Sequence, residues 1–370
     1  MTALYYMANM RFPTERAHGI QVAKMCEAFA RSGANVTLLV PDRKTIQDDP
    51  FTYYGLERNF TIEKIPVPDI VRFGTVGFLV ESFLFALRAT RRALQEKDAI
   101  IYTREELPLL LLPAYRAFYE AHQLRRSSFF LLGIKRAKGI ISITQGLKDA
   151  LVRIGVPEGR IFVAHDGYDE RQFSLSVTRA EARGRLSLPL DGKIAMYIGG
   201  FEVWKGVDTL CKSAEFLKKE NVKVVVIGGT AEEKEKYSRM YPLVTFLGAR
   251  PYTELAVNQQ AADILVVPNS ANTDLGSKFT SPLKLFAHMA SGVALVVADT
   301  PSLKEVVDPT QIIKFTPDNP ESLAYAIRKA LSSEWLASWI SKEAGEVKKR
   351  AKEFTWDERA KNVLAYMYDN

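Results

Sequence analysis

The chain has 370 residues, of which 47% are hydrophobic and 25% are charged, and its formal net charge is +7 at pH 7. This composition is that of a globular protein with a large core, and the length predicts two domains. The positive charge suits nucleic acid, an anionic membrane surface or a polyanionic small ligand. No helix-turn-helix, RNA-binding signature or zinc spacing accompanies it, so we expect no nucleic-acid partner.

The first half of the chain alternates strand patterns with helix patterns. In chain order we expect Ala3–Met7 (strand), Ile20–Arg31 (helix), Asn35–Val40 (strand), Thr61–Ile65 (strand), Val76–Leu94 (helix), Ala99–Tyr102 (strand), Gly139–Ile143 (strand), Gln145–Ile154 (helix) and Ile161–Ala164 (strand). This alternation predicts a parallel, doubly wound sheet with right-handed crossovers. The first apolar run is short and leads into a polar loop, so we expect a strand there and no signal peptide.

A polar stretch, Arg171–Gly192, has no strong strand pattern and is interpreted as a linker. After it the alternation restarts with Ile194–Ile198, Val207–Leu217, Val222–Ile227, Glu232–Met240, Val244–Leu247, Tyr252–Ala261, Ile264–Val267, Pro282–Ala290, Ala294–Ala298, Pro320–Leu331 and the terminal helix Trp356–Tyr368. We therefore expect two Rossmann-like domains, residues 1–175 and 190–350. They would face each other across a cleft at the carboxyl ends of both sheets, where open α/β sheets bind ligands.

The cysteines and the apolar segments bear on where in the cell the protein is found. Cys26 and Cys211 lie in apolar helix patterns, which suits reduced thiols in a cytoplasmic protein. No stretch reaches the roughly 18 apolar residues of a membrane span. Ile70–Leu94 is rich in Phe and Leu and ends in a basic turn. We interpret it as a core helix, with peripheral contact to the inner membrane face as the secondary hypothesis.

The first strand leads to His18 and Gly19, where a helix opens. A glycine there lets backbone N–H groups approach an anion, although it could equally serve only to start the helix. His18 could contact a ligand or cap the loop. The loop has no G-x-G-x-x-G fingerprint and no acid spaced to hold a nicotinamide ribose, which argues against a dehydrogenase.

The second domain opens with the strand end Tyr197–Gly200 and the helix start Trp204–Asp208. The paired glycines Gly199 and Gly200 permit close backbone approach. Lys205 is spaced to reach back toward a diphosphate, the alternative being a solvated loop lysine.

The segment Phe279–Gly292 predicts a helix with an N-cap at Ser281, a first turn at Pro282 and a C-cap at Gly292. Free N–H groups at Thr280–Leu283 would form an anion site aimed at the same place as Lys205. The sequence has no D-x-D triplet, and its four histidines lack metal-ligand spacing, so we expect no metal ion.

At these residues the sequence resembles the retaining glycosyltransferases of family 4. The resemblance runs through Ala17–Ile20, Tyr119–His122, Asp166–Asp169 with Phe173, Tyr197–Gly200, Trp204–Asp208, Val244–Gly248, Ala262–Ile264, Val267–Ser270, Ser281–Gly292 and Phe354–Trp356. It implies a GT-B fold in which the second domain binds a nucleotide sugar and the first binds the acceptor. It also implies that the helix at 355–370 returns to the first domain.

The resemblance assigns roles by position. Gly19 approaches the distal phosphate of the donor, His122 bonds the donor sugar, and Lys205 pairs with the diphosphate. The remaining donor positions are Gly199, Gly200, Gly248, Ala249, Arg250, Asn269, Thr280, Ser281, Pro282, Leu283, Lys284 and Ala287. No cofactor is implied beyond the nucleotide sugar as co-substrate.

The sequence departs from the family pattern at three positions. Two glutamates, one touching the donor sugar and one gripping the ribose, are replaced by Phe279 and Ala287. Alanine cannot accept a hydrogen bond from ribose, so an engineered knockout, a natural variant and a degenerate protein all stay open. In a natural variant His288 or Asn269 would substitute. Gly200 stands where many relatives have an arginine, for which Lys278, Lys284 or Arg250 could substitute.

These observations lead to the hypothesis of a metal-independent hexosyltransferase that retains anomeric configuration. Its acceptor would be a glycan, a lipid-linked sugar or a small molecule, as in polysaccharide biosynthesis. Arg104 and Glu105 are candidates for acceptor contact, and with His18 they form the acceptor set. Glu105 could instead lie at a solvated helix start, and His122 could be a core histidine. A sugar-nucleotide epimerase of the same fold and an impaired nucleotide-sugar-binding protein are the alternatives.

Overall fold

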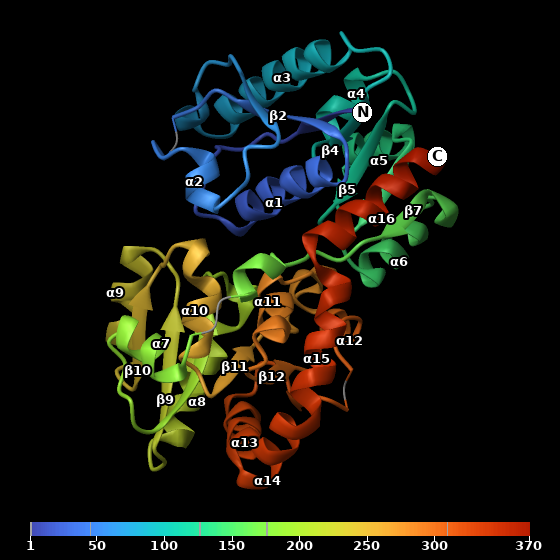
Figure 1. Cartoon of the computed structure of the whole chain (residues 1–370). Coiled ribbons are helices and arrows are strands. Elements are labelled where there is room, and N and C mark those ends of the chain that lie inside the picture. The colour runs from blue at the N-terminus through green and yellow to red at the C-terminus, as the bar shows by residue number, and fades with distance from the viewer. Residues whose placement is uncertain (1, 45, 126, 175–176, 309) are drawn as a thin grey trace. The chain divides into compact units, whose positions relative to one another are not determined.

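The computed structural model describes residues 2–44, 46–125, 127–174, 177–308 and 310–370, which form two compact units (Figure 1). The first unit comprises Met1–Asp166 and Trp356–Asn370, and the second comprises Gly167–Thr355. The chain thus passes from one unit to the other twice. The first unit ends at Asp166, before the boundary that the sequence suggested at 175.

The first unit contains a seven-stranded parallel sheet in the order β3-β2-β1-β4-β5-β6-β7. Its strands are β1 (Ala3–Met7), β2 (Asn35–Pro41), β3 (Thr61–Ile65), β4 (Ile100–Thr103), β5 (Ala117–Ala121), β6 (Gly139–Ser142) and β7 (Ile161–Val163). Its helices are α1 (Ala17–Arg31), α2 (Pro50–Tyr54), α3 (Gly74–Ala93), α4 (Glu106–Leu111), α5 (Ser128–Arg136), α6 (Gln145–Arg153) and α16 (Trp356–Asp369). The strand order reverses between β1 and β4.

The second unit contains a six-stranded parallel sheet in the order β10-β9-β8-β11-β12-β13. Its strands are β8 (Lys193–Ile198), β9 (Val222–Ile227), β10 (Val244–Gly248), β11 (Ile264–Val267), β12 (Ala294–Ala298) and β13 (Ile313–Phe315). Its helices are α7 (Arg179–Arg185), α8 (Val207–Leu217), α9 (Ala231–Met240), α10 (Leu255–Gln260), α11 (Leu283–Ser291), α12 (Pro301–Lys304), α13 (Pro320–Leu331), α14 (Ser333–Ser338) and α15 (Ala344–Ala351). Here the order reverses between β8 and β11.

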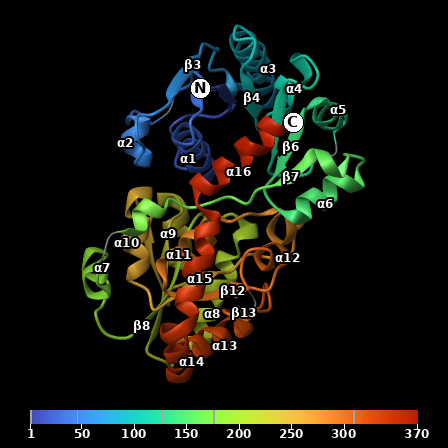
Figure 2. The same cartoon turned by 45° about the vertical axis from the view of Figure 1, so that its right-hand side comes forward.

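The predicted pair of doubly wound parallel sheets is confirmed. Central strands such as β8 and β11 are almost continuous apolar runs, because helices cover both faces of a parallel sheet. The C-terminal helix α16, red in Figures 1 and 2, lies along α1 in the first unit. Inside that unit the buried Arg359 of α16 donates to Glu120 at 2.5 Å and to the carbonyl oxygen of His165 at 2.8 Å.

The polar stretch Arg171–Gly192 is not a linker, because it contains α7 and belongs to the second unit. Thr178 caps this helix, and Glu181 bonds back to the backbone of Thr178 in a capping box. The buried Arg183 then pairs with Asp263 at 2.6 Å. The stretch looked like a linker because its polar residues satisfy caps and ion pairs instead of forming an apolar face.

The core-helix interpretation of Ile70–Leu94 is also wrong for its first half. Several large apolar side chains of α3 are exposed there, while its second half packs into the unit. By length and composition alone, Val71–Ala93 could cross a membrane, with a mean hydropathy of 1.3. The sequence expectation that no stretch is long and apolar enough is therefore corrected.

Candidate functional site

Four of the predicted donor residues lie at the carboxyl ends of strands in the sheet of the second unit. Gly199 and Gly200 follow β8, Gly248 ends β10, and Asn269 follows β11. Open α/β sheets bind ligands at this edge, where the strand order reverses. The residues of this cluster all belong to the second unit.

Lys205 is held in place by the loop that opens α8. It ends a short 3-10 helix, and Gly206 follows it with a φ of 69°. A Cβ at Gly206 would lie 1.9 Å from the carbonyl oxygen of Pro268, so only glycine permits this approach to the end of β11. The side chain of Lys205 is largely buried, and its Nζ pairs with Glu202 at 2.7 Å.

Two lysines converge on the backbone of Gly200. A Cβ placed there would lie 2.9 Å from Nζ of Lys205 and 2.4 Å from Oε2 of Glu202. Nζ of Lys284 donates to the hydroxyl of Tyr197 at 3.0 Å, and that hydroxyl donates to the carbonyl oxygen of Gly200 at 2.7 Å, so Lys284 reaches Gly200 through Tyr197. Any side chain at position 200 would displace the side-chain ends of Glu202 and Lys205.

The charges around Gly200 favour an anion. Burial and then the positive charge of Lys205 lower the pKa of Lys284 well below its usual value. Although partial burial opposes its ionisation, Glu202 has a lowered pKa because Lys205 bonds it and attracts its charge. A bound diphosphate would favour the charged form of Lys284.

Of the three candidate substitutes for an arginine at position 200, Lys284 is linked to Gly200 through the hydroxyl of Tyr197. Lys278 is exposed and pairs with Asp274 at 2.9 Å. Arg250 is exposed after β10, as is Ala249, while the carbonyl oxygen of Gly248 accepts from the backbone of Gly228 at 2.9 Å.

Helix α11 begins one residue later than predicted. Leu283 is its first residue, and Pro282 occupies the N-cap position with φ −78° and ψ 114°. The predicted N-cap position is therefore wrong by one residue, because Pro282 and not Ser281 occupies it. Thr280 and Ser281 are buried just before it, and Gly292 ends the helix in the predicted left-handed conformation.

Ala287 faces the apolar core of the second unit with 2% of its surface exposed. His288 is fully buried, with Nδ1 3.1 Å from Nε2 of Gln259 on α10. Burial and then the charge of Lys284 lower the pKa of His288 to about 3, so its ring is neutral. Nδ1 is thus taken up by α10, whereas Nε2 has no hydrogen-bond partner among the described residues.

Asn269 is fully buried at the end of β11. Neither its Oδ1 nor its Nδ2 has a hydrogen-bond partner among the residues that the structure describes. A buried amide without partners is costly, which is expected where a ligand completes the bonding.

In the first unit, three predicted residues lie near one another. Arg104 donates to Gln21 at 2.7 Å, and Nε2 of His122 lies 3.6 Å from Oε2 of Glu120. Burial and then the charge of Arg104 lower the pKa of His122 to about 4 and that of His18 to about 4. Both imidazoles are therefore neutral at pH 7.

Gly19 has a packing reason to be glycine. A Cβ there would lie 2.3 Å from the hydroxyl of Tyr54 and 2.6 Å from Cγ2 of Thr14. The structure thus accounts for this glycine by close packing against α2, whether or not an anion also approaches it.

Glu105 occupies the N-cap position of α4 and is partly buried. Its Oε1 accepts from the backbone N–H of Asn9, at the end of β1, at 3.2 Å. Burial and then the charge of Glu106 raise the pKa of Glu105. Glu105 therefore lies at the edge where β1 and β4 reverse the strand order.

Sequence reasoning missed a buried ion pair at the same edge. Arg43 follows β2, pairs with the fully buried Glu81 of α3, and donates to Asn9 at 2.6 Å. Glu81 is the one acid between residues 74 and 93, and that isolated charge is the signal that could have identified it.

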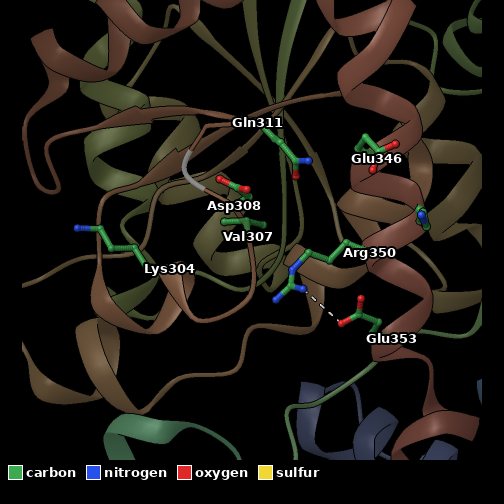
Figure 3. Close-up of a pocket in the computed structure, with 8 residues that line it drawn as sticks. Lys304, Val307, Asp308, Gln311, Glu346, Arg350 and Glu353 are labelled. Atoms are coloured by element: carbon green, nitrogen blue, oxygen red, sulfur yellow. Dashed lines mark hydrogen bonds and ion pairs between the residues drawn. The ribbon is translucent and has the colours of Figure 1, made fainter.

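A separate cavity of about 540 Å³ lies beside α15 in the second unit (Figure 3). Its lining includes Lys304, Asp308 and Glu346, and Arg350 pairs with Glu353 at 3.3 Å. None of the predicted site residues lines it. Among the described residues, no group of three or more His, Cys, Asp or Glu side chains is placed to hold a metal ion.

Comparison with protein families gives one match within the second unit. The family described as glycosyl transferases group 1 matches residues 192–333. The D-inositol 3-phosphate glycosyltransferase of Xylanimonas cellulosilytica is 27% identical over 247 residues, which are 62% of this chain and 57% of the relative. The protein of that name from Mycobacterium leprae is 35% identical over 124 residues, 30% of this chain and 27% of the relative. The chain thus spans about half or less of the length of these curated relatives.

Solved structures resemble the whole chain. Sucrose-phosphate synthase from Thermosynechococcus elongatus has a TM-score of 0.77 at 20% identity, covering 100% of this chain and 98% of that one. Anabaena HepE in complex with UDP and glucose has a TM-score of 0.74 at 15% identity, covering 100% of both chains. At these identities the likeness to solved structures establishes the fold, which is the GT-B fold. The family match is to the group 1 glycosyltransferases and covers residues 192–333 of the second unit.

Proposed function

We propose that the chain transfers a sugar from a nucleoside diphosphate sugar to an acceptor hydroxyl, retaining anomeric configuration and using no metal ion. The observation that carries the donor half is the convergence of Lys205 and Lys284 on the backbone of Gly200. HepE was solved with UDP and glucose and also with UDP-glucose, which makes a uridine donor the first to test.

The two lysines and the N-terminus of α11 supply the charge stabilisation that a metal ion would otherwise give to the leaving diphosphate. In the proposed step the bond from the anomeric carbon to the phosphate oxygen breaks, and the acceptor oxygen bonds that carbon on the same face. The acceptor proton passes to the departing phosphate oxygen. No separate general base is then required.

Residues of the first unit take the remaining roles. The neutral His122 can donate a hydrogen bond to a sugar hydroxyl without adding charge, since its pKa is about 4. Arg104 and Glu105 are proposed to contact the acceptor, which is a glycan, a lipid-linked sugar or a small molecule. D-Inositol 3-phosphate is a rational first acceptor to test, because the curated relatives are named for it. We place the enzyme in the cytoplasm.

The donor site is tested by calorimetry with UDP and GDP on four proteins: the natural chain, Lys205→Met, Ala287→Glu and the control Lys212→Met. Lys212 is a matched lysine on α8 whose exposed side chain pairs with Asp208. Lys205→Met removes a charge-assisted bond to the diphosphate that is worth about 1.5–3 kcal/mol. We therefore expect it to weaken nucleotide binding about tenfold or more. The control should bind like the natural chain. If no protein binds either nucleotide, the donor site is wrong.

Transfer is then measured with and without EDTA, and NMR of the product reports its anomeric configuration. An inverted product would contradict retention, and loss of activity in EDTA would contradict metal independence. Release of a free epimerised sugar without acceptor would instead support the epimerase.

One observation favours a second candidate, a nucleotide-sugar-binding protein with impaired turnover. Ala287 lies in apolar core and offers ribose no hydrogen-bond acceptor. If the chain binds UDP but never transfers sugar, this candidate is supported. Tighter UDP binding by Ala287→Glu, by about tenfold per 1.4 kcal/mol gained, would place position 287 at the ribose.

A further inference from the structure

Helix α3 exposes an apolar stripe on its first half. Val76, Leu79 and Phe83 follow helical spacing and are 72%, 57% and 48% exposed, and Phe73 just before the helix is 66% exposed. Contiguous apolar surface of this kind marks an interaction site in soluble proteins. We call these four residues the α3 stripe.

The inward side of the same segment is polar. Glu81 is fully buried and pairs with Arg43, and Ser82 accepts a hydrogen bond from Asn9 at 2.8 Å. A surface helix normally turns its apolar side inward and its charges outward. The reversed arrangement is explained if something apolar covers the outer side.

The exposed charges on and beside α3 are positive, which indicates the kind of surface that the α3 stripe binds. Between residues 74 and 93 the one acid is the buried Glu81, whereas Arg88 and Arg91 are exposed. Arg72 is exposed just before the helix, with its guanidinium 4.9 Å from the ring centroid of Phe73. An apolar stripe flanked by exposed arginines suits a surface that is apolar within and anionic at its headgroups.

The basic apolar surface extends beyond α3. Helix α4 contacts both α3 and α5 within the first unit (Figure 2). On α5, Phe129 is 71% exposed and Leu132 is 56% exposed, and the last turn carries Lys135 and Arg136. Two helices that both pack on α4 therefore expose apolar side chains, with the exposed Lys135 at the end of α5.

We propose that α3 docks on an anionic lipid surface, with the α3 stripe at the headgroup boundary and Arg72 and Arg91 near the lipid phosphates. The helix lies on the membrane and does not cross it, because its other side holds the buried Glu81 pair and packs Phe85 into the unit. This inference stands apart from the transferase activity and needs no sugar substrate.

The test is co-sedimentation of the full chain with vesicles of phosphatidylcholine alone or with about 30% phosphatidylglycerol, a content that gives the surface a negative potential. We expect binding to the anionic vesicles and little to the neutral ones. Val76→Gln/Leu79→Gln/Phe83→Gln should lower the apparent partition coefficient about tenfold or more, since each side chain loses the free energy of apolar burial. The control triple variant replaces exposed apolar residues of the second unit, Met240, Tyr325 and Ile340, by glutamine and should bind as the natural chain does.

A charge variant makes the test independent of the apolar one. Arg72→Gln/Arg91→Gln should bind anionic vesicles several-fold more weakly and with a smaller dependence on salt. Circular dichroism and thermal unfolding establish that each variant is folded. Failure to sediment at low salt, or unchanged binding by the stripe variant, would overturn the proposal. So would a dimer of the natural chain, detected by light scattering, that the stripe variant abolishes.

Discussion

At the scale of single residues, Glu202 occupies the anion position that the donor diphosphate would take. Its carboxylate pairs with Nζ of Lys205 at 2.7 Å beside the backbone of Gly200. A diphosphate must therefore compete with an internal carboxylate for the same ammonium group. Half of the carboxylate side chain is solvent-exposed, which limits how strongly it competes.

We predict that Glu202→Gln tightens UDP binding, by roughly two- to tenfold at low salt, because it removes a like charge from the site. Calorimetry over a series of salt concentrations measures the effect, which should shrink as salt rises. Glu215→Gln is the matched control, since Glu215 pairs with Lys218 on the exposed side of α8. Equal changes in both variants would argue for a general charge effect.

His122 gives a prediction for pH. Its pKa is lowered to about 4 by burial and by Arg104, whereas an unfolded histidine has a pKa near 6.5. Between about pH 6.5 and pH 4, His122 is therefore protonated in the unfolded chain but neutral in the folded chain. The free energy of unfolding falls as pH falls through this range. Between pH 7 and pH 5 the natural chain should lose about 2 kcal/mol more than His122→Gln. Urea unfolding at both pH values measures it, and parallel losses would contradict it.

The sequence predicted individual residues of the candidate site better than it predicted which residues contact one another. Lys205 and the flanking glycines were visible because a strand end, a glycine pair and a helix start are local patterns. The crowding around Gly200 could not be predicted from the sequence, because the side chains of Lys205 and Glu202 fill that space only after the loop folds. The Arg43 and Glu81 pair was missed for the same reason, since its members are 38 positions apart.

At the scale of elements, α16 is tied to the first unit by one buried guanidinium. Arg359 contacts Glu120 at 2.5 Å and is fully surrounded, whereas Asp357 on the same helix meets Arg31 at the surface. Although burial opposes its ionisation, Glu120 has a pKa well below its usual range because the guanidinium of Arg359 stabilises its charge. Loss of Arg359 would leave that carboxylate buried without its main partner.

We predict that Arg359→Met destabilises the first unit by about 3–5 kcal/mol, the usual result of breaking a buried ion pair from one side. Asp357→Asn on the same helix should cost at most about 1 kcal/mol, because its pair is exposed. Chemical denaturation of both variants distinguishes the two. Comparable losses would mean that α16 is held by its apolar contacts instead of by Arg359.

The sequence failed to predict a helix where polar residues, instead of an apolar face, hold it in place. The α7 segment lacks an apolar stripe, so its helix had no periodic signal beyond the capping box at Thr178. The prediction for α3 was wrong in the opposite sense. The apolar residues of its first half were interpreted as core, but they are exposed. Periodicity shows which residues share a face but not whether that face is covered.

At the scale of the whole molecule, the candidate residues divide between the two units. Lys205, Asn269 and Lys284 lie in the second unit, and Arg104 and Glu105 lie in the first. The division at Asp166 and Thr355 places each of these two sets within one unit, and Gly19 and His122, to which the resemblance also gives donor contacts, lie in the first unit. Nucleotide binding and sugar transfer should therefore respond to different substitutions.

We predict that Glu105→Gln lowers the rate of transfer about tenfold or more, as expected for the loss of a contact to a charged group, and leaves the Kd for UDP unchanged. Its amide oxygen can still accept from the backbone of Asn9, so the loop is preserved. Lys205→Met should weaken UDP binding and slow transfer together, because its charge serves both. Calorimetry and initial rates measured on the same preparations give the two quantities. If Glu105→Gln weakened UDP binding as strongly as Lys205→Met does, Glu105 would belong to the donor site, and the proposed division of roles between the units would be wrong.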